Sequence, residues 1–391
     1  MVTAATGVAA LGSGVNGSVL GANDRINLAL LGVGQRGLIR EAVQFAEESG
    51  IRITALCDTW KGRPERGAAF IKEKLGYEPD KLVDYQELFA RNDVDAVLIA
   101  TPDHQHCEML SAAVKAGKDV YIEKPLANNF QELKTAVADV KASGRVVQVG
   151  TQIRSLPACR GARELFRSGE LGKVFKIEQS RNAAVPFWHQ KARPNLKESE
   201  VDWKRFLFNK EDRPFDPDVY SAWMGYREFC LGVHTQLMVH FIDTVHYITG
   251  AKYPQTVSAM AGTYIYKDQR DCADSMEISM EYPKDGFLAR YGTAFGSGEG
   301  TFFRFFGQEG ALNATRWSWN DPFVIEKAGK ETGKAPLGES THHMKNFFDC
   351  IRSRKTPSAD IDSGFGHSVA ALMAEKSIVE GRTIRFSDLD L

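Results

Sequence analysis

A glycine-rich turn between an apolar strand and a helix is the feature that most limits what this chain can fold into. Residues 26–32 form a continuous apolar run of strand length, as expected for a parallel strand covered on both faces. The run leads directly into G-V-G-Q-R-G at 32–37, followed by a helical pattern over 38–48 and a second apolar run at 53–57. This order predicts the first half of a doubly wound parallel sheet that binds a dinucleotide.

Each glycine of the turn has its own expected role. Gly32 allows the tight turn, Gly34 lets the backbone approach a pyrophosphate, and Gly37 lets the helix and strand pack closely. The N-terminus of the helix offers unpaired N–H groups to the phosphates. We therefore expect the residues of this turn to bind the cofactor: Gly32, Gly34, Gln35, Arg36 and Gly37.

An acidic residue stands where such a domain selects its nucleotide. Asp58 ends the second apolar run, 21 residues after Gly37. Its carboxylate is expected to accept hydrogen bonds from the adenosine ribose hydroxyls and to repel a 2′-phosphate, which favours NAD over NADP. Lys61 and Arg63 follow closely and oppose that preference.

Further apolar runs repeat the same alternation. Strands are predicted at 95–101, 120–122 and 145–150, with helices over 107–116 and 130–143, which gives an α/β Rossmann domain over residues 24–150. Ligands of such sheets bind at the carboxyl ends of the strands. Polar motifs follow three of these strands: T-P-D-H-Q-H at 101–106, E-K-P at 123–125 and G-T-Q-I-R at 150–154.

Together with the glycine turn, these motifs make the chain resemble the Gfo/Idh/MocA family of oxidoreductases, which includes glucose-fructose oxidoreductase and inositol dehydrogenase. The resemblance extends from about residue 24 to the end of the chain. It implies a nicotinamide cofactor, a second domain with an open sheet over the cofactor cleft, and a homodimer or homotetramer. We expect the motif residues to form the site: Thr101, Pro102, His104, His106, Glu123, Lys124 and Gln152 at the cofactor, and Arg154 at the substrate.

Lys124 is the first candidate catalytic residue. An ammonium group at a strand end beside a nicotinamide can hydrogen-bond a substrate hydroxyl and stabilise alkoxide character as hydride leaves. The resemblance implies the same position, because the equivalent lysine of the family contacts both substrate and cofactor. We expect Lys124 to serve in catalysis and in binding of both ligands.

A second candidate lies in the predicted helix over 232–250. Gln236, His240 and Asp243 recur at i, i+4 and i+7 and so share one helix face. His240 falls on the family's acid/base position, and a histidine near neutrality can accept the hydroxyl proton. Gln236 falls where many members carry an aspartate that orients this histidine, and Asp243 is expected to contact the substrate.

The second half of the chain abandons the alternation of strands and helices. After a helix over 157–168, strands are predicted at 173–180, 256–265, 275–282, 286–295 and 301–306, which indicates an α+β domain over 151–391 with an open, mostly antiparallel sheet. The stretch 185–226 between them is rich in aromatic residues, including Trp188 and Tyr226. These rings either stack on a sugar or pack in a core or subunit interface.

Composition excludes several classes of protein. The formal net charge is −1, which gives no electrostatic case for nucleic-acid binding, and no apolar run has the length of a membrane span. The six cysteines are scattered without a C-x-x-C pair, and the three histidines at 234, 240 and 246 lack the spacing of a zinc pair, so no metal site is predicted. Residues 1–23 are small and uncharged, which suits either an export-signal remnant of a periplasmic protein or a flexible arm.

Two functions remain open on the sequence. The first is an NAD(P)-dependent oxidoreductase that acts on a secondary hydroxyl of a sugar, glycoside or polyol. The second is a glycosidase or lyase that uses the same hydride step transiently, eliminates a leaving group and restores its cofactor. Lys124 and His240 argue against a purely regulatory nucleotide-binding protein.

Overall fold

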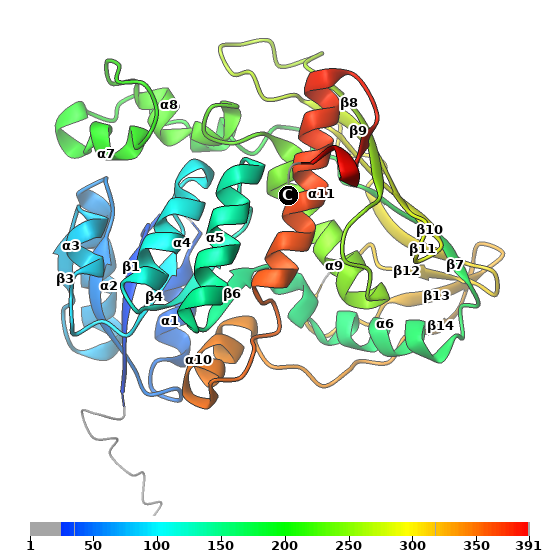
Figure 1. The fold of residues 1–391 in the computed structure, drawn as a ribbon, viewed down its shortest axis with the longest axis horizontal. Helices are drawn as coiled ribbons and strands as arrows, with labels where there is room; N and C mark the ends of the chain where they lie inside the picture. Colours follow the sequence, from blue (N-terminus) through cyan, green and yellow to red (C-terminus); the bar gives the residue numbers. More distant parts are fainter. Residues whose placement is uncertain (1–24, 35, 317, 390–391) are drawn as a thin grey trace, which may run out of the picture.

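The computed structural model describes residues 25–34, 36–316 and 318–389. Two sheets, each with its own helices, lie side by side in Figure 1. The predicted export segment and Gln35 lie outside the described residues, so both stay predictions. Within the described residues, no helix combines the length and the apolar character that a membrane crossing requires.

The N-terminal domain is the predicted doubly wound sheet. Its six parallel strands run in the order β3-β2-β1-β4-β5-β6. The strands are β1 (Ile26–Leu31), β2 (Ile51–Cys57), β3 (Asp80–Leu82), β4 (Ala96–Ile99), β5 (Asp119–Glu123) and β6 (Val147–Gly150). The helices are α1 (Leu38–Phe45), α2 (Gly62–Leu75), α3 (Tyr85–Phe89), α4 (His106–Lys115) and α5 (Phe130–Ser143).

Strand order reverses between β1 and β4, and this reversal opens the ligand crevice of the sheet. Gly32 follows β1 with φ +87°, and a Cβ built there would lie 2.4 Å from the Ala100 carbonyl oxygen, which follows β4. Only glycine accommodates both the left-handed backbone and this contact. The turn therefore passes tightly over the edge of β4.

The second domain carries a nine-stranded sheet in the order β14-β13-β12-β11-β7-β10-β9-β8-β15. All neighbours are antiparallel except the pair of β10 and β7. Its strands are β7 (Val174–Ser180), β8 (Thr256–Gly262), β9 (Ser275–Tyr282), β10 (Phe287–Ala294), β11 (Phe302–Gly307), β12 (Ala311–Asn313), β13 (Val324–Lys327), β14 (Lys330–Lys334) and β15 (Ile384–Arg385). This confirms the predicted mostly antiparallel sheet.

Helices fill the space between the two sheets. α9 (Val239–Thr249) packs on both α6 (Pro157–Ser168) and α11 (Ile361–Glu380), and α11 also contacts α5 of the first domain. α11 was not predicted, because it is buried on most sides and shows no amphipathic period. It runs through the middle of the molecule as the red helix in Figure 1.

The N-terminal unit recruits one helix from the far end of the chain. α10 (His343–Ser353) packs under β6 and α1, where Phe347 and Phe348 share a core cluster with Leu28 and Leu98. The predicted domain boundary near residue 150 therefore does not separate two contiguous folding units. Figure 1 shows this orange helix beneath the blue and cyan elements.

A long excursion from the second domain reaches back over the first. We call residues 185–230 the strap; it contains α7 (Trp203–Leu207) and α8 (Pro217–Ser221). The strap has its own apolar cluster, built around Trp203, Phe206 and Tyr220. In Figure 1 the strap lies above the ends of the parallel strands.

Candidate active site

A pocket of about 480 Å³ lies where the crevice of the parallel sheet meets the strap and the second domain. Predicted site residues from five separate segments meet in its lining. They are Gly32, Gly34, Arg36, Asp58, Thr101, Pro102, His106, Glu123, Lys124, Gln236 and His240. The pocket thus brings together the glycine turn, the strand-end motifs and the histidine segment.

The nucleotide end is built around Asp58. Its carboxylate accepts hydrogen bonds from the Val33 and Trp60 amides, both at 2.9 Å, and the Arg63 guanidinium lies 3.5 Å away. The aspartate thereby ties the glycine turn to the end of β2. Arg63 is within ion-pair distance of the carboxylate that was predicted to bind the ribose. The contact between Asp58 and the ribose remains a prediction.

The turn fits a dinucleotide. α1 starts after Gly37, and no side chain of the described residues caps its start, so the first N–H groups of the helix suit a phosphate. Gly34 lines the pocket, and the nearest atoms to a Cβ built there belong to the Arg63 side chain, at 3.5 Å, so the backbone is open to a ligand. These features suit the pyrophosphate of NAD.

Glu123 joins three motifs. Its Oε1 accepts hydrogen bonds from Arg36 Nε at 2.7 Å and from Gln152 Nε2 at 2.8 Å. A Cβ built at Gly150 would lie 2.8 Å from this carboxylate, so the glycine of G-T-Q-I-R makes room for it. Gln152 does not line the pocket; it holds Glu123 and Tyr121, and its predicted contact with the cofactor is replaced by this positioning role.

The two histidines of T-P-D-H-Q-H have different places. His106 is buried between the carbonyl oxygens of Thr101 and Pro125, at 2.9 and 2.6 Å, and so ties one strand-end loop to the next. His104 lies outside the pocket lining, with its Nε2 3.0 Å from the Phe206 carbonyl oxygen of the strap. Burial lowers the pKa of His104 to about 3, so it stays neutral as a packing residue.

Lys124 lies at the centre of the other end of the pocket. Its Nζ donates to the side-chain and main-chain oxygens of Gln236, at 3.0 and 3.1 Å. Gln236 in turn donates to the carboxylate of Asp103 at 2.5 Å. Burial lowers the pKa of Lys124, while the nearby carboxylates of Glu123 and Asp103 counteract the decrease.

This contact corrects the role predicted for Gln236. The amide reaches Lys124 and Asp103 rather than the imidazole of His240, because residues 234–238 form a π-helical segment ahead of α9. The wider turn changes which residues share a face, so the i, i+4 relation of a regular helix does not hold. π-Segments occur frequently at functional sites.

His240 lines the pocket beside Lys124 as predicted. Burial and the charges of Lys124 and Arg181 lower its pKa well below the usual value. Its Nδ1 is buried without a hydrogen-bond partner among the described residues. A neutral imidazole with an available nitrogen can accept a proton.

Arg154 and Asp243 were predicted to contact the substrate, but the structure pairs them elsewhere. Their side chains are 6% and 1% exposed, and they form a bidentate ion pair at 2.8 and 2.5 Å. His367 Nδ1 lies 3.5 Å from the same carboxylate. Neither member of the pair lines the pocket, so they position α9 rather than bind a ligand.

The aromatic predictions are likewise corrected. Trp188 is 1% exposed and packs edge-to-face on Phe187 and Phe295, while the Tyr226 hydroxyl donates to Asp218 at 2.8 Å. Both side chains are used in packing the strap, away from the pocket lining. Other aromatic residues of the same stretch line the pocket: Phe187, Phe206, Tyr220 and Trp223.

The strap is attached firmly to the nucleotide end. The Asp202 amide donates to the Thr59 carbonyl at 2.7 Å, and the hydroxyls of Thr59 and Tyr220 lie 2.9 Å apart. The Gln105 side chain donates to the Phe206 carbonyl at 2.9 Å. These contacts close the strap over the ends of β2 and β4.

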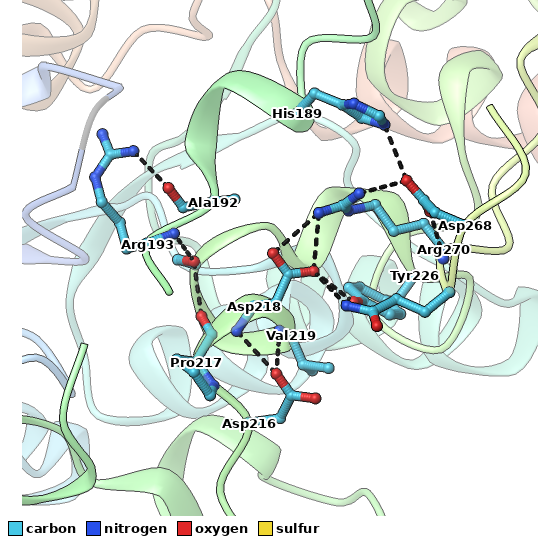
Figure 2. Close-up of polar contacts among 12 residues, drawn as sticks. His189, Ala192, Arg193, Asp216, Pro217, Asp218, Val219, Tyr226, Asp268 and Arg270 are labelled. Atoms are coloured by element: carbon cyan, nitrogen blue, oxygen red, sulfur yellow. Dashed lines mark hydrogen bonds and ion pairs between the residues drawn. The ribbon is translucent and has the colours of Figure 1, made fainter. Parts of the chain in front are cut away.

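A second network braces the strap from the other side. Figure 2 shows Asp218 accepting hydrogen bonds from Tyr226 at 2.8 Å and from Arg270 at 2.9 Å. Arg270 also pairs with Asp268 at 2.6 Å, and His189 of the strap lies 3.4 Å from Asp268. The loop that follows β8 therefore holds the strap in place through Asp268 and Arg270.

Several pocket residues were not predicted from the sequence. The position of Asp103 within T-P-D-H-Q-H was the one signal that could have identified it. Arg181, Lys191 and Arg193 line the pocket from the second domain and the strap, without any motif or period that marks them.

Comparison with known proteins agrees with this architecture. Residues 26–151 match the model of the oxidoreductase family with an NAD-binding Rossmann fold, and residues 207–313 match the GFO/IDH/MocA C-terminal domain. The aldose-aldose oxidoreductase of Caulobacter crescentus superposes with a TM-score of 0.71 at 20% identity, over 93% of this chain and 100% of that one.

Two curated relatives are similar over part of their length. The 2,7-anhydro-N-acetylneuraminate hydratase of Mediterraneibacter gnavus is 24% identical over 69% of this chain and 62% of its own. The scyllo-inositol 2-dehydrogenase (NAD(+)) of Bacillus subtilis is 32% identical over 38% of this chain and 42% of its own. The matches thus span less than two thirds of either relative. With its Rossmann turn, E-K-P lysine and second sheet in these places, the chain belongs to the Gfo/Idh/MocA family of oxidoreductases, whose N-terminal domain binds NAD.

Proposed function

We propose that this protein transfers hydride between NAD and a secondary hydroxyl group of a sugar, glycoside or polyol. The observation that carries the proposal is the meeting of Lys124 and His240 at one end of a pocket whose other end is the dinucleotide turn. The inositol dehydrogenase among the relatives supports this substrate class. When bound, the nicotinamide ring supplies the hydride acceptor or donor.

The two side chains have complementary roles in the oxidation of a hydroxyl group. Lys124 has three N–H donors, two of which are used by Gln236, so one remains for the substrate oxygen. His240, neutral because of its lowered pKa, accepts the hydroxyl proton. Lys124 stabilises the negative charge that develops on the oxygen.

A second function uses the same residues without net redox change. The strap closes over the nucleotide end through contacts with Thr59, Trp60 and Gln105, which favours slow exchange of the dinucleotide. A retained nucleotide suits a lyase, hydratase or glycosidase in which the nucleotide is restored in every turnover. The hydratase among the relatives supports this candidate.

One experiment separates the two functions. The purified protein is denatured to identify any nucleotide that it carries, and then added NAD is offered with sugars, polyols and aryl glycosides while the absorbance of reduced nicotinamide is followed. Growth of this absorbance with a free sugar or polyol supports the dehydrogenase. Release of the aryl group at constant absorbance supports the second function, and Lys124→Met should abolish either activity.

We also propose that the protein is a homo-oligomer that associates through the outer face of the nine-stranded sheet. Met260 and Leu288 are 77% and 53% exposed on this sheet, which gives an apolar contribution to a self-complementary surface. Light scattering of the purified chain tests the oligomer. Export to the periplasm is tested by fractionation of cells that express the full chain.

A further inference from the structure

Asp103 is a buried carboxyl group at the substrate end of the pocket, the end where Lys124 and His240 lie. It lines the pocket although it is only 3% exposed. Its Oδ2 accepts a hydrogen bond from Gln236 Nε2 at 2.5 Å. A buried carboxyl group is costly unless it is hydrogen-bonded, so this contact is the physical reason for its place. The contact also links Asp103 to Lys124 through one amide group.

The fold fixes the position of Asp103 through a short turn after β4. Asp103–Gln105 form a 3₁₀ turn, and the other two side chains of the turn hold the strap. His104 Nε2 lies 3.0 Å from the Phe206 carbonyl oxygen, and Gln105 Nε2 donates to the same oxygen at 2.9 Å. The turn is therefore anchored on its strap side while Asp103 contacts Gln236.

The amide of Gln236 has one orientation that suits both of its neighbours. The Lys124 ammonium group only donates, so the atom that faces it is the amide oxygen, at 3.0 Å. The NH₂ group then points to Asp103, whose oxygen accepts. Burial raises the pKa of Asp103 well above its usual value, but a protonated carboxyl group keeps its carbonyl oxygen as an acceptor. Asp103 therefore fixes the amide in either protonation state.

The orientation of this amide decides where the third N–H group of Lys124 points. Lys124 Nζ donates to the side-chain and main-chain oxygens of Gln236, at 3.0 and 3.1 Å. Two acceptors in fixed positions hold the tetrahedral ammonium group against rotation. If the side-chain oxygen moved, the ammonium group could rotate about its bond to the main-chain oxygen, and the remaining N–H would lose its direction.

We propose that Asp103 is a positioning residue for the reaction: it holds the Gln236 amide so that Lys124 keeps one N–H directed at the oxygen of the reacting hydroxyl group. The proposal rests on the proposed function, in which this N–H stabilises the negative charge that develops on that oxygen. Because Asp103 acts through Gln236, its effect is on the chemical step rather than on the binding of the sugar or of NAD.

The test compares two replacements of Asp103. Asp103→Leu removes the acceptor and should lower kcat about 100-fold, with KM for the sugar and Kd for NAD changed by less than about threefold. Asp103→Asn keeps an acceptor oxygen in a side chain of the same shape and should retain kcat to within about fivefold. Asp93→Leu, which breaks a surface pair with Arg91 outside the pocket lining, is the matched control and should leave kcat unchanged. Thermal unfolding verifies that each variant keeps its fold.

A double variant shows whether Asp103 acts through Gln236. Gln236→Leu should lower kcat about as much as Asp103→Leu, and the double variant should be no slower than Gln236→Leu, because the path is already interrupted. Additive losses would contradict this path. An Asp103→Asn variant as slow as Asp103→Leu would show that the acceptor oxygen is not what matters. A higher KM for the sugar at unchanged kcat would overturn the proposal and make Asp103 a substrate-binding residue.

A measurement that needs no turnover keeps this proposal separate from the proposed function. In protein labelled with ¹⁵N at the glutamine side chains, the Gln236 amide is identified as the NMR signal that is absent from Gln236→Leu. Its protons should exchange with water at least about tenfold faster in Asp103→Leu than in the unmodified protein, since a hydrogen bond is lost. Faster exchange in a protein that oxidises no sugar would support the positioning of the amide and contradict the proposed function. Equal exchange would contradict the positioning.

Discussion

The two ends of the pocket are built on different principles. At the nucleotide end, each charged side chain has a partner from a nearby motif, as in the pairs of Asp58 with Arg63 and Glu123 with Arg36. At the substrate end, Lys124, Arg181 and Lys191 come from three separate segments that the fold brings into one pocket lining. The nucleotide end is thus held by side-chain pairs between local motifs, whereas the substrate end is assembled from segments far apart in the chain.

The largest expected effect is at the substrate end. Lys124→Met should lower kcat by about a thousand-fold, because the variant loses both the donor and the charge that stabilise the reacting oxygen. NAD affinity should change by less than about threefold if the two ends are independent, since the nucleotide turn keeps its own pairs. Steady-state kinetics and NAD titration measure the two quantities. A similar loss of both would show that the two ends of the pocket are not independent.

The next largest effect concerns the buried ion pair of Arg154 and Asp243, which positions α9. Arg154→Met leaves the carboxylate of Asp243 buried beside His367 alone, and should lower the free energy of unfolding by about 3–5 kcal/mol. The double variant Arg154→Met, Asp243→Leu should recover most of this loss, because it removes both charges. Urea denaturation measures the difference.

Arg205→Met, which breaks surface pairs with Asp84 and Asp202, provides the control and should cost about 0–1 kcal/mol per pair. The pKa of Asp243 is lowered, with burial opposed by the charge of Arg154, so the pair's contribution is complete at neutral pH and is lost only as the pH falls through the folded-state pKa. An unfolding free energy of Arg154→Met equal to that of the control would contradict the role of the pair.

Two glycines of the turn at the nucleotide end are expected to differ in their effect on stability and on NAD binding. Gly32→Ala should destabilise the ligand-free protein by about 2–4 kcal/mol, since a Cβ there strains the left-handed backbone and meets the Ala100 carbonyl at 2.4 Å. Gly34→Ala should change stability by less than about 0.5 kcal/mol but weaken NAD binding, because its Cβ points where the phosphates approach. Thermal unfolding with and without NAD separates the effects. Equal stability of the two variants would show that the turn is less tight than described.

The smallest effect is on the pH profile. The pKa of His240 is lowered by burial and by Lys124, so its neutral form persists below pH 6.5. We expect kcat/KM for hydroxyl oxidation to stay constant from pH 8 to about 6, whereas an unperturbed imidazole would give an acidic limb near 6.5. A limb at or above pH 6.5 that disappears in His240→Asn would show that the cations of the substrate end do not act on this residue.

The local motifs and strands were predictable because their signals are short in range. The glycine turn, the apolar strands and E-K-P each lie within a few residues, and parallel pairing brings the carboxyl ends of such strands to one edge. Lys124 and Asp58 follow from that geometry alone. The helix α2 and the central helix α11 were missed, the latter because a helix that is buried all round shows no amphipathic period.

Side-chain roles across the domains could not be predicted. Gln236 contacts Lys124 because residues 234–238 form a π-helical segment. Arg154 forms an ion pair with Asp243, which lies 89 residues further along the chain. Whether a polar residue meets a ligand or another protein group depends on which distant segments fold over it. The periodic pattern contains no such information.

The sequence by itself determined the Rossmann domain, the antiparallel second sheet, the family and the place of Lys124 at a strand end, because these follow from backbone periodicity and contiguous motifs. The tertiary structure alone decided that the strap closes the nucleotide end, that α10 belongs to the first domain's core, and that Arg181 and Lys191 join Lys124. Electrostatic interaction depends on distance in space, and the distance between residues far apart in the chain is set only when the whole molecule packs.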